Sequence, residues 1–368
     1  MKSLHAVFVA SAIVLAGALT TVAEAADIKI AVAGPMTGST AAIGAQMKAG
    51  VSAAVEALNA SGTLGARIEL VVADDACDPK QAVAVANRLA ADNVKLVVGH
   101  YCSSSSIPAS NVYAEAGVLQ ITPGSTNPQL TERGLENVFR VCGRDDQQGV
   151  VAADYILKHH KGKKIAVLDD KSTAGKGIAD VVAARLSEQG VKDFLRDSYG
   201  AGEKDYTALV SRLKREGSQI VYIGGYYTEA ALIVRQGAQA NARFTVMSND
   251  PLMTNEFWSI AADAAEGTLF TFMPDPSKNA SATEAVAKLK AANVEPEGFT
   301  LYAYAAVQMW ADAAKRAGNF DVAKVAAALR AAPVDTVLGS LRFDAKGDNM
   351  APGFVVYRWH NRVAETVQ

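Results

Sequence analysis

The feature that most constrains the fold of this sequence is a repeated alternation between short apolar runs and longer segments of helical period. The apolar runs have the length of strands, and the intervening segments carry apolar residues three and four positions apart. Alternation of this kind is typical of α/β folds, in which parallel sheets are covered by helices on both faces. The predicted strands are 28–33, 68–73, 96–98, 119–122, 138–141, 164–168, 220–223, 244–247, 268–272 and 354–359, and the predicted helices are 47–58, 79–91, 149–157, 177–189, 206–215, 299–317 and 322–332.

The alternation runs twice, which favours two lobes over one large doubly wound sheet. The first set of strands ends near Gly143, and the second begins at Lys164. If the late helices rejoin the first lobe and the last strand rejoins the second, the chain crosses between the lobes three times and forms a hinge. We therefore predict two Rossmann-like lobes with parallel-sheet cores, 26–145 plus 273–348 and 146–272 plus 349–368.

The N-terminal segment predicts export. Lys2 and His5 precede an apolar run over 6–22, and Ala23-Glu24-Ala25 has the A-x-A form of a signal-peptide cleavage site. We expect residues 1–25 to be removed as a signal peptide, which leaves a soluble exported protein. The formal net charge of −2 argues against nucleic acid or an anionic membrane as a partner.

The chain has three cysteines, and two of them are expected to pair in an oxidising compartment. Cys77 and Cys102 each follow a predicted strand, and neighbouring parallel strands end side by side. A Cys77–Cys102 disulfide is therefore the natural bridge by geometry. Cys142 lies inside an apolar strand pattern and is predicted to be a buried free thiol.

Enzyme signatures are mostly absent. Asp170 stands where a P-loop around Gly175-Lys176-Gly177 needs its first glycine, and no G-x-S-x-G motif surrounds the serine tract 103–106. His100 is next to that tract and could act as a base, although a histidine hydrogen-bonded within a turn is the commoner arrangement. No histidine or cysteine spacing suits zinc, so we expect neither a metal nor a cofactor.

The segment 94–110, VKLVVGHYCSSSSIPAS, reads as a buried strand, a tight turn and the start of a helix. Free backbone N–H groups and the helix dipole at such a point attract an anion, although a serine-rich turn that only caps the helix is the alternative. Ser103 is the predicted carboxylate ligand, whereas Ser105 and Ser106 are expected to cap the helix or lie on the surface.

Hydrogen-bonding groups follow four predicted strands, where open α/β sheets bind their ligands. Neutral donors follow two strands of the first lobe, and aromatic residues and Asp250 follow two strands of the second. A zwitterion that bridges the lobes would satisfy both halves, because buried charges need partners. Ordinary turn chemistry favours the same residue types and is the alternative for each cluster alone. The clusters are 101–103, 124–126, 224–227 and 248–250.

These residues closely resemble the periplasmic binding proteins of branched-chain amino acid ABC transporters, along nearly the whole mature chain. The resemblance implies the two-lobed, hinged fold of type I periplasmic binding proteins and also the Cys77–Cys102 disulfide. Its densest segments are 74–87 (DDACDPKQAVAVAN), 99–110, 121–123 (ITP), 201–205 (AGEKD) and 224–226 (GGY).

The resemblance also implies roles for individual residues. Ser103 and Thr126 would bind the ligand carboxylate with help from the backbone of Gly124 and Ser125, and Asp250 would bind the ammonium group where relatives often carry glutamate. Tyr226 and Cys102 would line the pocket.

Three positions depart from leucine-binding relatives. Ile43 and Ala174 replace aromatic residues, whereas Tyr101 replaces an aliphatic one. The loss of rings leaves room for a bulkier ligand side chain such as that of phenylalanine, and the choice between aliphatic and aromatic ligands stays open.

The resulting functional hypothesis is a monomeric solute-binding protein that captures an amino acid and delivers it to a membrane permease. An exported amidase-like hydrolase that uses the serine tract is an alternative, and it requires a base close to Ser103. A sensory ligand-binding module is a second alternative, and it requires a membrane tether or a receptor.

Overall fold

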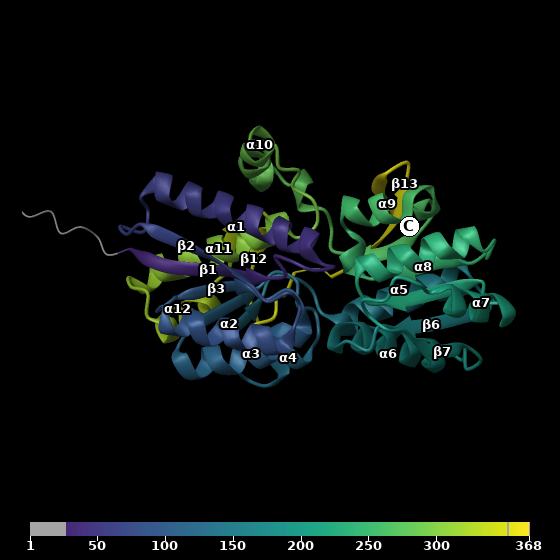
Figure 1. Cartoon of the computed structure of the whole chain (residues 1–368). Coiled ribbons are helices and arrows are strands. Elements are labelled where there is room, and N and C mark those ends of the chain that lie inside the picture. The colour runs from purple at the N-terminus through teal and green to yellow at the C-terminus, as the bar shows by residue number, and fades with distance from the viewer. Residues whose placement is uncertain (1–26, 352, 368) are drawn as a thin grey trace, which may run out of the picture.

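The computed structural model describes residues 27–351 and 353–367, so the predicted signal peptide lies outside the described residues (Figure 1). The first sheet has five parallel strands in the order β2-β1-β3-β4-β5. Its strands are β1 (Ile28–Gly34), β2 (Ile68–Asp74), β3 (Leu96–Gly99), β4 (Leu119–Thr122) and β5 (Val138–Arg140).

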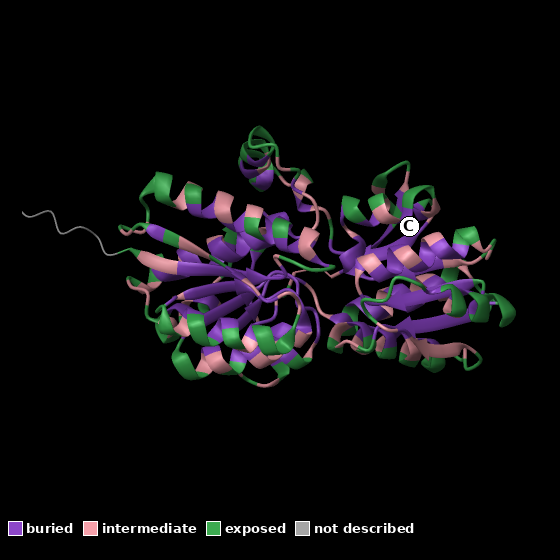
Figure 2. Cartoon of the chain, in the orientation of Figure 1, coloured by how far each residue is buried: buried purple, intermediate pink, exposed green. Residues whose placement is uncertain are grey.

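Alternating side chains place helices on both faces of this sheet. Ile30 and Val32 of β1 belong to the same buried cluster as residues of α1 and α11, whereas Ala31 and Ala33 pack with α2 and α3. The sheet is therefore buried from both sides, as Figure 2 shows. The helices of this lobe are α1 (Ala41–Ser61), α2 (Pro79–Ala91), α3 (Ser103–Ala116), α4 (Gln129–Glu132), α10 (Thr283–Ala291), α11 (Thr300–Ala317) and α12 (Val322–Ala331).

The second sheet has seven strands in the order β14-β13-β10-β9-β8-β6-β7, in which β13 pairs antiparallel with both β10 and β14 and the other pairs are parallel. Helices α5 and α6 pack with one face, and α7, α8 and α9 pack with the other. The elements are α5 (Asp145–His159), β6 (Ile165–Asp169), α6 (Thr173–Glu188), β7 (Leu195–Ser198), α7 (Thr207–Arg215), β8 (Ile220–Gly224), α8 (Tyr227–Gln239), β9 (Thr245–Ser248), α9 (Asn255–Ala261), β10 (Leu269–Phe272), β13 (Val355–His360) and β14 (Val363–Val367).

The chain passes between the lobes three times. It leaves the first sheet after β5, and it returns after β10 because α11 packs on α1 and β3. After the hairpin of β11 (Val334–Thr336) and β12 (Gly339–Leu341), strand β13 pairs with β10 in the second sheet. The predicted α/β fold with two lobes is confirmed.

Several boundaries differ from the prediction. Helices α1, α5 and α6 begin four to six residues earlier than predicted, because their first turns carry alanine, glycine and polar residues without an apolar period. Strand β7 was not predicted, because its residues LRDS form a half-buried edge without an apolar run. Strands β11, β12 and β14 were also not predicted. Cys142 is a buried free thiol, as predicted, but it lies beyond the end of β5 rather than inside the strand.

Candidate functional site

The loops at the ends of the two sheets touch one another across the space between the lobes. The Asn127 side chain donates a hydrogen bond to the Thr173 carbonyl over 2.9 Å, and Thr228 Oγ1 donates to the Ser39 carbonyl over 2.6 Å. The lobes are therefore closed on each other, and the side chains that follow the strands are enclosed between them.

The first-lobe half of the site is the N-terminus of α3. Ser103 is its first residue and is buried, and its Oγ accepts a hydrogen bond from the Asn127 N–H over 3.3 Å. The predicted disulfide between Cys77 and Cys102 is confirmed, with a Cα–Cα distance of 5.5 Å. This bridge anchors the turn before α3, whose first N–H groups have no partner within the helix.

The loop after β4 is held by hydroxyl groups. Thr122 Oγ1 donates to the His100 carbonyl over 2.6 Å and accepts hydrogen bonds from the N–H groups of Gly124 and Ser125. Ser125 Oγ donates to the Tyr101 carbonyl over 2.7 Å. These bonds use the Gly124 and Ser125 N–H groups internally and fix the position of the buried Thr126, which follows them.

The second-lobe half contains Asp250 and Tyr226. Asp250 begins the 3-10 turn Asp250–Leu252 after β9, and only 2% of its surface is exposed. Its Oδ1 has no hydrogen-bond partner, and burial raises the pKa of its carboxyl to about 7. Tyr226 immediately precedes α8, and its buried hydroxyl also has no partner. The side chain of Asp250 is therefore available to a ligand.

Two polar residues of this site were not predicted, Asp145 and Gln148 in the first turn of α5. Asp145 is 1% exposed, and neither of its carboxylate oxygens has a hydrogen-bond partner. Burial, followed by the charge of Asp250, raises the pKa of Asp145 to about 8. Asp145 follows a predicted strand just as the other clusters do, so the strand-end criterion would have identified it.

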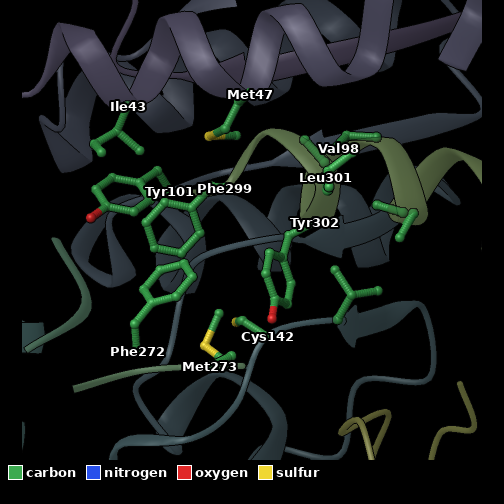
Figure 3. Close-up of a cluster of buried hydrophobic side chains, with 14 of the residues drawn as sticks. Ile43, Met47, Val98, Tyr101, Cys142, Phe272, Met273, Phe299, Leu301 and Tyr302 are labelled. Carbon is green, nitrogen blue, oxygen red and sulfur yellow. The ribbon is translucent and has the colours of Figure 1, made fainter. Parts of the chain in front are cut away.

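Aromatic rings form the wall of the site. Figure 3 shows the Tyr101 and Phe299 rings packed beneath Ile43 and Met47 of α1. The Tyr101 ring centroid lies 5.2 Å from that of Phe299 and 5.9 Å from that of Tyr226, and its hydroxyl is buried without a partner.

Glycine at position 124 makes room for the Tyr101 ring, because an added Cβ would lie 2.6 Å from Tyr101 Cδ2. Ile43 is fully buried, and Ala174 lies half-buried in the first turn of α6. Phe299 was not predicted as a site residue, because its position before a helix carries no local signal.

His100 is held by a buried network. Its Nδ1 lies 2.5 Å from Asp75 Oδ2, and its Nε2 lies 2.9 Å from the Tyr113 hydroxyl. Both ring nitrogens are engaged away from Ser103, so His100 supports the turn, which was the commoner arrangement considered for it.

The prediction that Ser105 and Ser106 cap α3 or lie on the surface is wrong. Both are fully buried inside α3, where Ser106 Oγ donates to the His100 carbonyl over 3.1 Å. The residue at the N-cap position is Cys102. The start of α3 faces the loops of the sheet rather than solvent, and this packing buries both serines.

The arginines near the acidic residues of the site pair with another carboxylate, although the charge of Arg140 partly offsets the raised pKa of Asp145. Arg140 and Arg144 both pair with Asp348, at 2.6 Å and 2.5 Å. Within residues 27–351 and 353–367 no lysine, arginine or histidine forms an ion pair with Asp145 or Asp250. The described part of the chain also has no helix that is long and apolar enough to cross a membrane.

A two-lobed parallel α/β fold that encloses polar groups between its lobes defines the class of solute-binding proteins. The chain belongs to the periplasmic binding protein family, whose model matches residues 27–363. It is 49% identical over 336 residues to a Leu/Ile/Val-binding protein homolog of Brucella suis, which covers 91% of each chain.

Two further comparisons agree with this family. An amino acid binding protein of Pseudomonas aeruginosa is 50% identical over 341 residues, which cover 92% of this chain and 91% of that protein. The branched-chain amino acid transporter substrate binding protein of Streptococcus pneumoniae, solved in complex with isoleucine, superposes with a TM-score of 0.83 at 27% identity. That superposition covers 93% of this chain and 99% of that one.

Proposed function

We propose that this protein binds an amino acid between its lobes and delivers it to the permease of an ABC transporter. The observation that carries the proposal is the buried carboxylate of Asp250, which follows β9 and whose Oδ1 has no hydrogen-bond partner. Tyr101 of the first lobe packs against Tyr226 of the second, with ring centroids 5.9 Å apart, and burial followed by the charge of Asp250 raises the pKa of Tyr101, which supports a position of Asp250 near the first-lobe loop that carries Tyr101.

The two ends of an amino acid match the two halves of the site. The hydroxyls of Ser103 and Thr126, together with the N-terminus of α3, suit a carboxylate. Asp250 suits the ammonium group, which would otherwise be buried without a partner. Tyr101, Tyr226, Ile43 and Ala174 surround the ligand side chain, and the disulfide of Cys102 keeps the carboxylate-binding turn in place.

The ligand is captured when the two lobes close around it. A ligand that contacts both lobes favours the closed state over the open one by the free energy of the contacts that only the closed state makes. The names of the relatives, Leu/Ile/Val-binding protein and amino acid binding protein, support an amino acid as this ligand.

Export and lobe boundaries complete the proposal. A signal peptide over residues 1–25 would direct the chain to the periplasm, where it would act as a monomer. Lobe one would comprise 26–145 plus 273–348 and lobe two 146–272 plus 349–368, and the membership of the strands in the two sheets supports this division.

No specific observation favours the hydrolase. That alternative needs a base close to Ser103, and His100, which lies next to the tract, is engaged by Asp75 and Tyr113. We therefore propose binding without covalent chemistry. In the sensory alternative the same closed form would be recognised by a receptor instead of a permease.

A thermal-shift screen of the mature protein tests the proposal. The ligands are L-leucine, L-isoleucine, L-valine, L-alanine and L-phenylalanine, each compared with the carboxylic acid that lacks the amine. A ligand that binds only the native state raises the melting temperature, so we expect stabilisation by amino acids. Stabilisation by the amine-free acids alone would contradict the assignment of Asp250.

A further inference from the structure

Three buried polar atoms gather around Tyr226 without a hydrogen-bond partner, and the two charged ends of the proposed ligand do not use them. They are the hydroxyl of Tyr226 itself, the hydroxyl of Tyr101 and Oδ2 of Asp170. Asp170 directly follows β6, and only 4% of its surface is exposed. Leaving such atoms unpaired is costly, so the structure calls for a bound group that supplies the missing hydrogen bonds.

The order of the second sheet places Asp170 and Asp250 on opposite sides of Tyr226. These three residues follow the adjacent strands β6, β9 and β8, of which β8 is the middle one. Asp169 pairs with Gly224 at the end of β8, and β9 ends within one residue of the same level. Adjacent strands lie about 4.8 Å apart, so about 10 Å separates the backbones at the two acids.

Two contacts turn the free oxygen of Asp170 toward the loop that carries Tyr226. Asp170 Oδ1 accepts a hydrogen bond from the Ser172 N–H over 2.8 Å, and a Cβ added to Gly225 would lie 3.1 Å from Oδ2. Gly225 immediately precedes Tyr226, whose ring centroid lies 5.9 Å from that of Tyr101. The three unpartnered atoms therefore belong to neighbouring residues drawn from both lobes.

The start of α6 lies at the contact between the lobes and carries a small residue. The Thr173 carbonyl accepts the hydrogen bond of Asn127 from the first lobe. Ala174 comes next, and its methyl group takes far less space than the aromatic residue that leucine-binding relatives place at this position. We therefore expect room for a longer ligand side chain beside Asp170.

Asp170 is an acid without a counter-ion. Burial raises the pKa of its carboxyl to about 6, and the charges of Glu229 and Asp169 add to this effect, so the group is ionised at neutral pH. In the part of the chain that the structure describes, Asp170 forms no ion pair, whereas Asp169 pairs with Arg196 at 2.5 Å. A cation from outside the chain would offset the charge of Asp170.

We infer that the ligand side chain ends in an ammonium group that Asp170 Oδ2 and the hydroxyls of Tyr101 and Tyr226 bind. The inference rests on the proposed function and narrows the ligand to a diamino acid such as ornithine. An ammonium group has three N–H donors, and these three oxygens provide one acceptor each. An apolar side chain would leave all three atoms without a partner.

The separation of the two acids suits a diamino acid. Of the roughly 10 Å between the backbones at Asp250 and Asp170, the two carboxylate side chains and their hydrogen bonds leave about 5–7 Å between the ligand nitrogens. An extended chain of about three or four methylene groups spans such a distance. The α-ammonium group would lie at Asp250 and the side-chain ammonium group at Asp170, with Tyr226 between them.

Two pairs of ligands of equal size test the inference by calorimetry at neutral pH. L-ornithine is compared with L-norleucine, and L-2,4-diaminobutyrate with L-norvaline, so that each pair differs only in a terminal amine and methyl group. Asp170→Asn removes the charge and keeps the shape of the side chain, and Tyr101→Phe removes only the hydroxyl. Glu203→Gln is the matched control, since Glu203 lies exposed in the loop after β7. Melting curves without ligand establish that the variants are folded.

We expect the wild-type protein to bind L-ornithine at least about tenfold more tightly than L-norleucine, and Asp170→Asn to abolish most of this preference. Tyr101→Phe should reduce the preference by a smaller factor, and Glu203→Gln should leave it unchanged. Tighter binding of the apolar member of each pair would overturn the inference and leave the proposed function intact, as would a full preference for L-ornithine in Asp170→Asn. If the wild-type protein binds neither these ligands nor the amino acids of the thermal-shift screen, both the proposed function and this inference fail.

Discussion

The charge of single residues sets the pH dependence of binding. Burial raises the pKa of Asp250 to about 7 and, with the charge of Asp250, that of Asp145 to about 8. As the pH falls through these values, both groups become neutral, and Asp250 loses the charge that would attract the ammonium group in the proposed site. Amino-acid affinity should therefore decrease on acidification from about pH 8.5 to about pH 6.5, measured by calorimetry.

The other titratable groups around the site do not reverse this sign. The buried tyrosines 101, 222 and 226 stay protonated, because burial raises their pKa further above the range tested. Burial also raises the pKa of Asp170 to about 6, below most of that range, and Arg140 remains paired with Asp348. An affinity that rises on acidification would contradict the prediction.

The stability of the ligand-free protein should change in the opposite direction. Asp145 and Asp250 bind protons more tightly in the folded state than in the unfolded state, where their pKa is near the ordinary value. Their contribution to the free energy of unfolding therefore increases as the pH falls from about 8.5 toward 6. Melting temperatures without ligand in Asp250→Asn, compared with wild type, isolate this contribution.

Tyr101 should control which ligand side chain fits. Its ring fills the space between Gly124, Phe299 and Tyr226, which an aliphatic residue would leave partly open. Tyr101→Leu should therefore shift the preference toward L-phenylalanine relative to L-valine by about tenfold, or roughly 1.4 kcal/mol. Competition binding measures this ratio, and an unchanged ratio would show that the ring does not limit the pocket.

How much of the site could be predicted differs from residue to residue. Ser103, Thr126 and Asp250 each follow a strand, so the periodicity of the chain was enough to place them at strand ends. Phe299 reaches Tyr101 only through the packing of α11 on α1, a contact between segments about 250 residues apart that no local pattern reports. Asp145 likewise has no ion-pair partner because Arg140 and Arg144 both pair with Asp348, a residue about 200 positions further along the chain.

Among elements, the turns before α2 and α3 are joined by the Cys77–Cys102 disulfide. Asp75 strengthens the same junction, because its Oδ1 accepts from the Cys77 N–H over 2.8 Å while Oδ2 contacts His100. The turn that presents Ser103 is therefore fixed from the neighbouring strand. A preformed carboxylate site loses less conformational entropy when the ligand binds.

The double variant Cys77→Ser, Cys102→Ser should unfold more easily and bind more weakly. The bridge spans 25 positions, and a loop of that length contributes about 3 kcal/mol to the free energy of unfolding. Urea denaturation measures the stability, and calorimetry measures the affinity for the ligand found in the screen. Full stability without the bridge would show that the Asp75–His100 contact alone holds the turn.

The elements were more predictable than their ends. Helix α2 has the predicted bounds, because Asp78 caps it and Pro79 stands at its first position. Helix α5 starts earlier than its apolar pattern, since its first turn buries the polar residues Asp145 and Gln148. The apolar period thus fails where a helix supplies polar groups to a binding site.

In the whole molecule, a hydrogen-bonded group connects the lobes directly after the turn Asp250–Leu252, for which we propose a role in ammonium binding. Glu297, which precedes α11 in the first lobe, accepts a hydrogen bond from the Asn255 N–H of the second lobe over 2.9 Å and from Thr254 Oγ1 over 3.3 Å. Gln46 of α1 contacts both Glu297 and the Met253 carbonyl. These bonds join residues of the two lobes, so we expect them to stabilise the closed state.

Glu297→Ala should consequently lower the affinity for every ligand by the same factor. The ligand does not touch Glu297 in the proposed site, so the substitution reduces only the free energy that favours the closed state. The loss of binding free energy should be about 1–2 kcal/mol, which weakens affinity roughly fivefold to thirtyfold. Glu295→Ala is the matched control, since that side chain lies in the same loop and is 65% exposed. Stopped-flow measurements should show faster ligand release with an unchanged affinity ratio between L-leucine and L-valine. A changed ratio would place Glu297 in ligand recognition, and unchanged release would show that the ligand alone holds the lobes together.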